Sequence, residues 1–195
     1  MKNVREPTYS FVILTFILII IDTILAWLSV VIFPTVLGNI VSSLFIAAAF
    51  MILFTLWFGC YGAIAAYVGT LVGSGLLVSD TLVQHPVIAL LWALAGLLQV
   101  LIPLAAVRNF GVNLSMENPR DFTYVLLFGV IINNLVGAAW ATWTLSLIGP
   151  MNMVSVFSAW LIGNIIVCLL IVPIALKIFT PKVEKHRLFV KNYWD

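Results

Sequence analysis

Apolar stretches of near-bilayer length follow one another along almost the whole chain, separated by short polar links. A helix needs roughly 20 apolar residues to cross a membrane, and such stretches lie near residues 11–33, 40–58, 63–78, 86–107, 126–143 and 154–178. Lys2 and Arg5 precede the first stretch as in a secretory signal, but this stretch is too long for one and no small-x-small cleavage site follows it. The pattern therefore predicts six transmembrane helices, the first of them retained.

The composition supports this interpretation. The 195-residue chain is 64% hydrophobic and 8% charged, with a mean hydropathy of +1.20, whereas a soluble domain carries about 25% charged residues. We expect an all-α polytopic integral membrane protein, with a six-helix domain over 1–179 and a short tail over 180–195. A net charge of +2 without a basic stripe gives no support for nucleic-acid binding.

The positive charges fall on one side of the predicted bundle. The links after the first, third and fifth stretches contain no Lys or Arg, and the other side holds all nine: Lys2, Arg5, Arg108, Arg120, Lys177, Lys182, Lys185, Arg187 and Lys191. The positive-inside rule identifies that side as the cytoplasm. We expect a multi-pass protein of the cell (plasma) membrane with cytoplasmic N- and C-termini, whose basic tail lies on the anionic inner leaflet or docks a partner protein.

Small residues recur at every fourth position in two of the stretches, which indicates close helix packing. One such face consists of Ala65, Gly69 and Gly73, and the other of Gly129, Asn133, Gly137 and Ala141. The short turn predicted at 59–62 requires the second and third helices to pack antiparallel.

Five polar side chains lie near the middle of their predicted helices, namely Asp22, Gln99, Asn133, Asn134 and Asn164. A buried amide without a partner costs several kcal/mol where water is absent, and no intramembrane Lys or Arg neutralises Asp22. Adjacent helical residues point about 100° apart, so Asn133 is expected in the small-residue face and Asn134 towards another neighbour. The set predicts a polar binding layer or, alternatively, groups that only fix helix packing, with Asp22 protonated or amide-bonded.

Three tryptophans, Trp140, Trp143 and Trp160, lie in the outer halves of the fifth and sixth stretches, and Trp160 shares a helix face with Asn164. An aromatic wall over an amide floor, open to the outside, suits a flat, neutral or weakly cationic solute. The alternative is an interfacial belt, which Trp143 fits best. The predicted substrate-binding residues are Asp22, Gln99, Asn133, Asn134, Trp140, Trp160 and Asn164.

The sequence offers no catalytic set. Gly73-Ser74-Gly75 is similar to the serine motif of intramembrane proteases, but the glycine two places before the serine is missing and no histidine lies within a predicted helix. Cys60 and Cys168 are isolated, which is typical of small buried hydrophobes. Without a metal-ligand cluster or a phosphate-binding glycine loop, we expect no enzymatic activity, no cofactor and no metal.

Short motifs resemble a known family of membrane domains. The run 159–164, followed by Pro173, resembles the last helix of MASE-type membrane-associated sensor domains, and Arg120-Asp121, Trp57-Phe58-Gly59 and 100–108 are also similar to that family. The likeness covers about residues 38–178 and implies a ligand-binding bundle. Asn164 stands where that family usually has an acid, and Val167 where a small residue is usual.

The six-helix layout, with inner helices rich in Gly and Ala, also resembles the substrate-binding S components of energy-coupling-factor vitamin transporters, which are similar in size. The first stretch lacks the alanine-rich face with which S components meet their coupling subunit. Sensor domains normally continue into a kinase or cyclase, whereas this sequence extends only about seventeen residues past its last stretch.

The leading hypothesis is an integral membrane protein that binds a small solute and serves as the substrate-recognition subunit of a transporter, with a coupling protein at its cytoplasmic face. One alternative is a stand-alone sensory module that signals to a separate partner. Another is a structural membrane subunit whose buried polar residues only fix helix packing.

Overall fold

The computed structural model describes residues 9–35 and 38–190, and these residues form a bundle of helices with one small hairpin. The elements in chain order are α1 (Tyr9–Ile32), β1 (Pro34–Thr35), β2 (Gly38–Ser42), α2 (Ile46–Phe58), α3 (Cys60–Gly69), η1 (Thr70–Leu76), α4 (Asp80–Gln84), α5 (Pro86–Phe110), α6 (Pro119–Leu126), η2 (Leu127–Ile132), α7 (Asn133–Ser146) and α8 (Met153–Val183). The η elements are π-helical turns within longer helices. Lys2, Arg5 and Lys191, three of the charges used to assign sidedness, lie outside the described residues.

Four helices are long and apolar enough to cross a membrane, namely Tyr9–Ile32, Pro86–Phe110, Pro119–Ser146 and Met153–Val183. Ile46–Phe58 and Cys60–Leu76 are apolar but shorter. Large apolar side chains stay exposed on the outer faces of α1 and α8, among them Ile13, Phe16, Ile20, Leu170 and Ile174. Such faces suit lipid contact rather than water, so the expected helical, membrane-associated character is confirmed.

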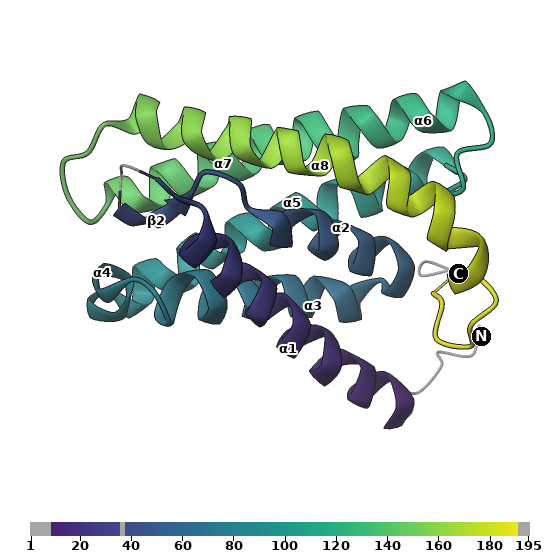
Figure 1. The fold of residues 1–195 in the computed structure, drawn as a ribbon, viewed down its shortest axis with the longest axis horizontal. Coiled ribbons are helices and arrows are strands. Elements are labelled where there is room, and N and C mark those ends of the chain that lie inside the picture. Colours follow the sequence, from purple (N-terminus) through teal and green to yellow (C-terminus); the bar gives the residue numbers. More distant parts are fainter. Residues whose placement is uncertain (1–8, 36–37, 191–195) are drawn as a thin grey trace.

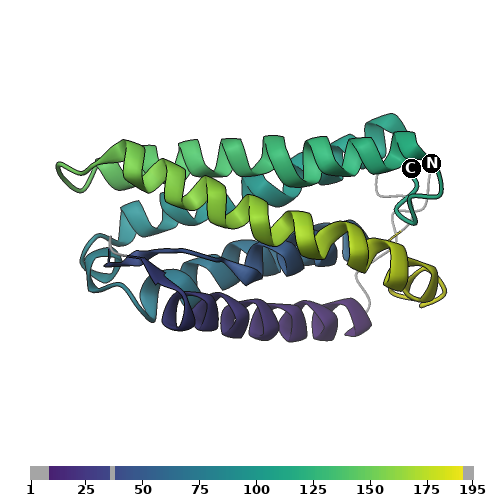
Figure 2. The ribbon, with the colours of Figure 1, turned by 45° about the horizontal axis from the view of Figure 1, so that its top comes forward.

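The helices run side by side along the long axis of the molecule (Figure 1). The hairpin end holds β1, β2, α4 and the α7–α8 connection (147–152), and the terminal end holds the start of α1, the end of α8 and the α5–α6 connection (111–118). A turned view shows the same arrangement (Figure 2). The N-terminal start of α1 and the C-terminal end of α8 therefore lie at the same end of the bundle.

The second helix begins later than the sequence pattern predicted. Residues 40–42 were expected to be helical but belong to β2, which pairs antiparallel with β1. The Ser42 hydroxyl contacts the backbone carbonyls of Ser29 (2.8 Å) and Phe33 (3.1 Å), and the Ser43 amide donates to the Phe33 carbonyl at 2.7 Å. These bonds hold the segment against the end of α1, so the helical prediction for 40–42 was wrong.

Two other boundaries also differ. The turn expected at 59–62 is reduced to Gly59, whose φ of 61° is one that glycine adopts readily, so α3 begins directly at Cys60. The link 80–84, expected to be an irregular polar connection, forms α4, whose first turn is capped by the Ser79 hydroxyl accepting from the Leu82 amide.

The last helix continues past residue 178, where the sequence placed its end. The Trp57 indole N–H donates to the Thr180 hydroxyl at 3.0 Å, and both side chains are buried. This bond fixes the end of α8 against the end of α2. Trp57 is thereby part of the core.

The predicted small-residue face on α3 and η1 is confirmed. A Cβ atom at Gly69 would lie 2.6 Å from the Asp22 Cβ, and one at Gly73 would overlap the Thr23 backbone carbonyl. Glycine at these positions therefore lets α1 lie directly against α3 and η1.

Gly73→Ala should lower the thermal stability of the protein in mild detergent, because the new methyl group must displace α1 backbone rather than a flexible side chain. Overpacking of this kind costs about 1–3 kcal/mol. The matched control is Gly149→Ala, since a Cβ there meets open space. Equal unfolding temperatures for the two variants, measured by differential scanning fluorimetry, would contradict the packing of α1 against η1.

Candidate functional site

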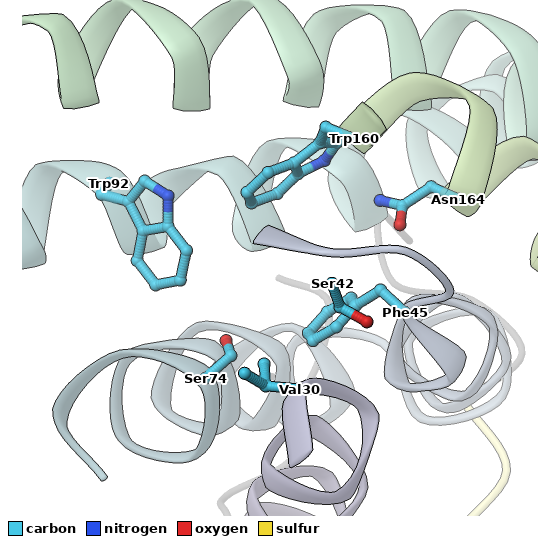
Figure 3. A pocket seen from close by; sticks show the side chains of 7 residues that line it. All are labelled: Val30, Ser42, Phe45, Ser74, Trp92, Trp160 and Asn164. Carbon is cyan, nitrogen blue, oxygen red and sulfur yellow. The ribbon is translucent and has the colours of Figure 1, made fainter. Parts of the chain in front are cut away.

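A buried pocket lies towards the hairpin end, where five elements meet (Figure 3). The residues that line it are Val30, Ser42, Phe45, Ser74, Trp92, Trp160 and Asn164, from α1, β2, the residue before α2, η1, α5 and α8. None of the described lining residues is charged. The pocket is thus a neutral, largely aromatic site enclosed by helices and one side of the hairpin.

The hairpin is held in this position from two sides. On one side the Ser42 hydroxyl bonds to backbone carbonyls at the end of α1. On the other, Gly163 lies so close to the Ser43 carbonyl that a Cβ atom at position 163 would overlap it. Because Asn164 follows Gly163 directly, this contact places the Asn164 amide beside Ser42 and Phe45.

The π-helical segment η1 supplies the pocket's second serine. The Ser74 hydroxyl donates to the Thr70 carbonyl at 2.9 Å, which directs its hydrogen into the backbone and leaves the oxygen able to accept. The Trp92 ring packs over Gly75, where a Cβ atom would lie 3.3 Å from the ring. Single π turns of this kind recur at functional sites because they re-aim side chains on a helix.

Two tryptophans form the aromatic part of the pocket. The rings of Trp92 and Trp160 meet edge to face, with centroids 5.8 Å apart and an interplanar angle of 85°. Trp160 lies between Trp92 and Asn164, and its indole nitrogen points towards the Asn164 amide nitrogen (Figure 3). Both rings are almost fully buried, with exposed fractions of 1% for Trp92 and 6% for Trp160.

Three N–H donors around this pocket have no hydrogen-bond partner among the described residues. They are Trp92 Nε1, Trp160 Nε1 and Asn164 Nδ2. Leaving a buried donor unpaired costs about 1–3 kcal/mol, so their gathering in one place is a substantial destabilising feature. The pocket has a cavity volume of about 10 Å³, roughly enough for one water molecule.

Of the seven predicted site residues, Trp160 and Asn164 lie together in this pocket. Gln99 and Asn134 lie elsewhere and bond to each other, the Gln99 amide donating to Asn134 Oδ1 at 2.6 Å. The Asn134 amide also donates to the Val130 carbonyl at 2.7 Å. The bond between Gln99 and Asn134 joins α5 to α7, which is the packing role considered as the alternative for this set.

The amide that faces α5 is Asn134, whereas the spacing had assigned the small-residue face to Asn133. A Cβ atom at Gly137 would overlap the Gln99 side chain, so Gly137 and Asn134 share the α5 contact. The π turn η2, directly before Asn133, has more residues per turn than an α-helix. The four-residue step from Gly129 to Asn133 crosses this turn, so these two residues do not stay on one face.

Trp140 is not a wall of the pocket. Its indole N–H donates to the Leu91 carbonyl at 2.7 Å and links α7 to α5. Trp143 is half exposed, as expected of an interfacial aromatic residue. The aromatic partner of Trp160 is instead Trp92, which the sequence reasoning missed. Trp92 and Trp160 each lie about two turns into their helices from the hairpin end, and this matching depth was the available signal.

Asp22 and Asn133 are fully buried, and their side-chain oxygen and nitrogen atoms find no hydrogen-bond partner in the described part of the chain. Neither lines the pocket. The structure therefore divides the expected polar layer into the pocket residue Asn164, the hydrogen-bonded pair Gln99 and Asn134, and these two separate groups.

Comparisons with protein-family models, with curated proteins and with solved structures found no match to this chain. The resemblance to MASE-type sensor domains and to S components stays a prediction from the residues that carry it.

Gln99→Met should destabilise the protein by about 1–3 kcal/mol, because it leaves the buried Asn134 oxygen without its donor. The double variant Gln99→Met/Asn134→Leu should lose less stability than the sum of the two single variants, since both partners are then apolar. Thermal unfolding of all four proteins in one detergent measures this coupling. Strict additivity would show that the pair does not interact.

Proposed function

We propose that this protein is a six-span integral membrane protein that binds a small solute in the pocket of Trp92, Trp160 and Asn164 and acts as the substrate-recognition subunit of a transporter. The single observation that carries the proposal is the gathering of three unpartnered N–H donors around one buried aromatic pocket. A packed bundle gains nothing from such an arrangement, whereas a binding site gains the partners that a solute brings.

The six-span topology counts two shorter apolar helices, Ile46–Phe58 and Cys60–Leu76, as membrane spans in addition to the four long ones. α2 and the α3–η1 rod are apolar, run antiparallel and pack against each other and α5. The hairpin precedes α2 and, at the hairpin end of the bundle, occupies the part of the membrane depth that this short helix does not span. With six crossings, both termini lie on one side of the membrane, in agreement with the described ends of α1 and α8 (Figure 1).

The cytoplasmic side is assigned to the terminal end. Arg108, Arg120 and Lys177 lie at or near this end, and the connections at the hairpin end carry no Lys or Arg. The pocket, which lies towards the hairpin end, would then receive its solute from outside the cell. A coupling protein would meet the opposite, cytoplasmic face.

The competing function is that of a structural subunit, which the bonds of Gln99 to Asn134 and of Trp57 to Thr180 favour. The two functions predict opposite effects of pocket substitutions on stability. If the donors serve only packing, their removal lowers stability. If they serve a solute, their removal abolishes binding and relieves an unpaired buried group.

Asn164→Leu and Trp160→Phe should each reduce the amount of small molecule that co-purifies with the protein in mild detergent by about threefold to tenfold. Each change removes one unpartnered N–H, while Trp160→Phe keeps an aromatic ring and Asn164→Leu keeps the branched shape of the side chain. Mass spectrometry of the purified protein measures the bound compound, and the Asn164→Leu variant should unfold at or above the temperature of wild-type protein stripped of its compound.

Trp143→Phe is the matched control, because Trp143 is half exposed and lies outside the pocket. It should leave both the bound compound and the stability unchanged. Lower stability of the two pocket variants, with the same co-purified compound as the wild type or with none, would favour the structural subunit.

A further inference from the structure

We infer that the solute is a neutral, flat molecule that binds through a carbonyl oxygen. This inference rests on the proposed function and names the chemistry of its ligand. It is carried by the balance of donors and acceptors in the pocket of Trp92, Trp160 and Asn164, by the charge of the lining and by the arrangement of its rings.

The pocket offers donors in excess. Trp92, Trp160 and Asn164 each present an N–H without a partner among the described residues, and each of these residues is at least nine-tenths buried. No side-chain oxygen of the described lining residues is both buried and unpartnered. A ligand that complements this wall must therefore bring acceptors, and a carbonyl oxygen can accept from two N–H groups at once.

The lining also excludes a charged ligand. An anion could accept from the same N–H groups, but no Lys or Arg among the described lining residues would neutralise it once it left water. A cation or an amine would add donors to a wall that already has three unpartnered ones, and among the lining residues the Ser74 oxygen is free to accept. The lining therefore favours a neutral solute over the weakly cationic one considered from the sequence, because Asp22, the carboxylate that could have paired with a cation, lies outside the pocket.

The aromatic rings favour a flat ligand. Trp92 and Trp160 stand perpendicular to each other, and Phe45 lies on the opposite side of the pocket (Figure 3). A ring that enters between them can stack on one indole while its carbonyl oxygen faces the N–H groups of Trp160 and Asn164. Because the cavity volume is only about 10 Å³, the Trp92 and Trp160 side chains must separate to admit it.

Two sources share this chemistry. A water-soluble solute such as an amide, a lactam or a nucleobase would enter from outside the cell. A membrane-borne quinone would reach the same groups from the lipid. Both carry a carbonyl oxygen on a flat, neutral ring, and the probes below separate them.

The test compares three water-soluble probes that share one ring and differ only in their polar group: benzamide is neutral with a carbonyl, benzoate is an anion, and benzylamine is a cation. A decyl-substituted benzoquinone represents the membrane-borne source. The full-length protein in mild detergent is titrated with each probe, and binding is measured as a saturable shift of the unfolding temperature. Benzamide or the quinone should bind, and benzoate and benzylamine should bind at least tenfold more weakly.

Each donor should contribute to this binding. Trp92→Phe, Trp160→Phe and Asn164→Leu should each lower the affinity for the preferred carbonyl probe by about threefold to tenfold. Trp143→Phe should leave this affinity unchanged. A preference for benzamide over the quinone identifies a water-soluble source, and the reverse preference identifies a membrane-borne one.

The results that overturn the inference are separable from those that overturn the proposed function. Two results would reject the carbonyl ligand but keep the solute-binding function. One is tighter binding of benzoate or benzylamine than of benzamide and the quinone. The other is a co-purified compound that has no carbonyl group and is lost in the Asn164→Leu variant. If no probe binds and no compound co-purifies, so that the three donors hold an ordered water only, both are rejected.

Discussion

The requirement that every buried hydrogen-bonding group find a partner within the protein governs this structure, because a bilayer offers no water to replace a missing one. Several deep polar side chains meet it through contacts between helices. Gln99 bonds to Asn134, the Trp57 indole to Thr180 and the Trp140 indole to the Leu91 carbonyl. These bonds connect α5 to α7 and α2 to α8, so the same groups that would destabilise an isolated helix in lipid specify which helices pack together.

The pocket is an exception to this requirement, and its unpartnered groups are all of one kind. Its three unpartnered groups are all donors, and they come from two tryptophans and one amide on different helices. Asp22, Thr55, Asn133 and Thr142 also have unpartnered side-chain atoms, but each stands outside this pocket. Chance failures of packing would leave donors and acceptors alike. A cluster that consists only of donors and is enclosed by aromatic rings is better explained by a bound molecule that supplies the missing acceptors.

The sequence was sufficient to predict the apolar helical segments, because apolar length depends only on the residues themselves. It also predicted that Trp160 and Asn164 share a face, since a four-residue spacing within an uninterrupted helix fixes this. The sequence was not sufficient where tertiary contacts decide. β2 replaces the first residues of the second predicted helix because Ser42 and Ser43 bond to α1 and Gly163 admits the hairpin backbone.

The pairing of Trp92 with Trp160 could not be predicted for a related reason. Which residues of α5 and α8 face each other depends on how the helices cross, and no local pattern records that. The π turns add a second difficulty, because η2 shifts the face of every residue after it. Asn134, three residues before Gly137, shares its contact with Gln99, whereas the spacing of small residues placed Asn133 on the face of Gly137.

The elements around the pocket differ in how deeply they are buried and in what holds them. In the most apolar part of α1 only 17% of the residues are buried, against 50% in α5 and α8. α5 is tied to α7 by the bonds of Gln99 and Trp140, whereas α1 meets η1 mainly through the close contact at Gly73. α1 also packs closely on α3 at Gly69, and the Ser42 hydroxyl bonds to its end, so α1 is held by close packing rather than by side-chain bonds between helices. The side of the pocket formed by Val30 and Ser42 therefore has the least protein around it, while Trp92, Trp160 and Asn164 stand on the more deeply buried helices α5 and α8.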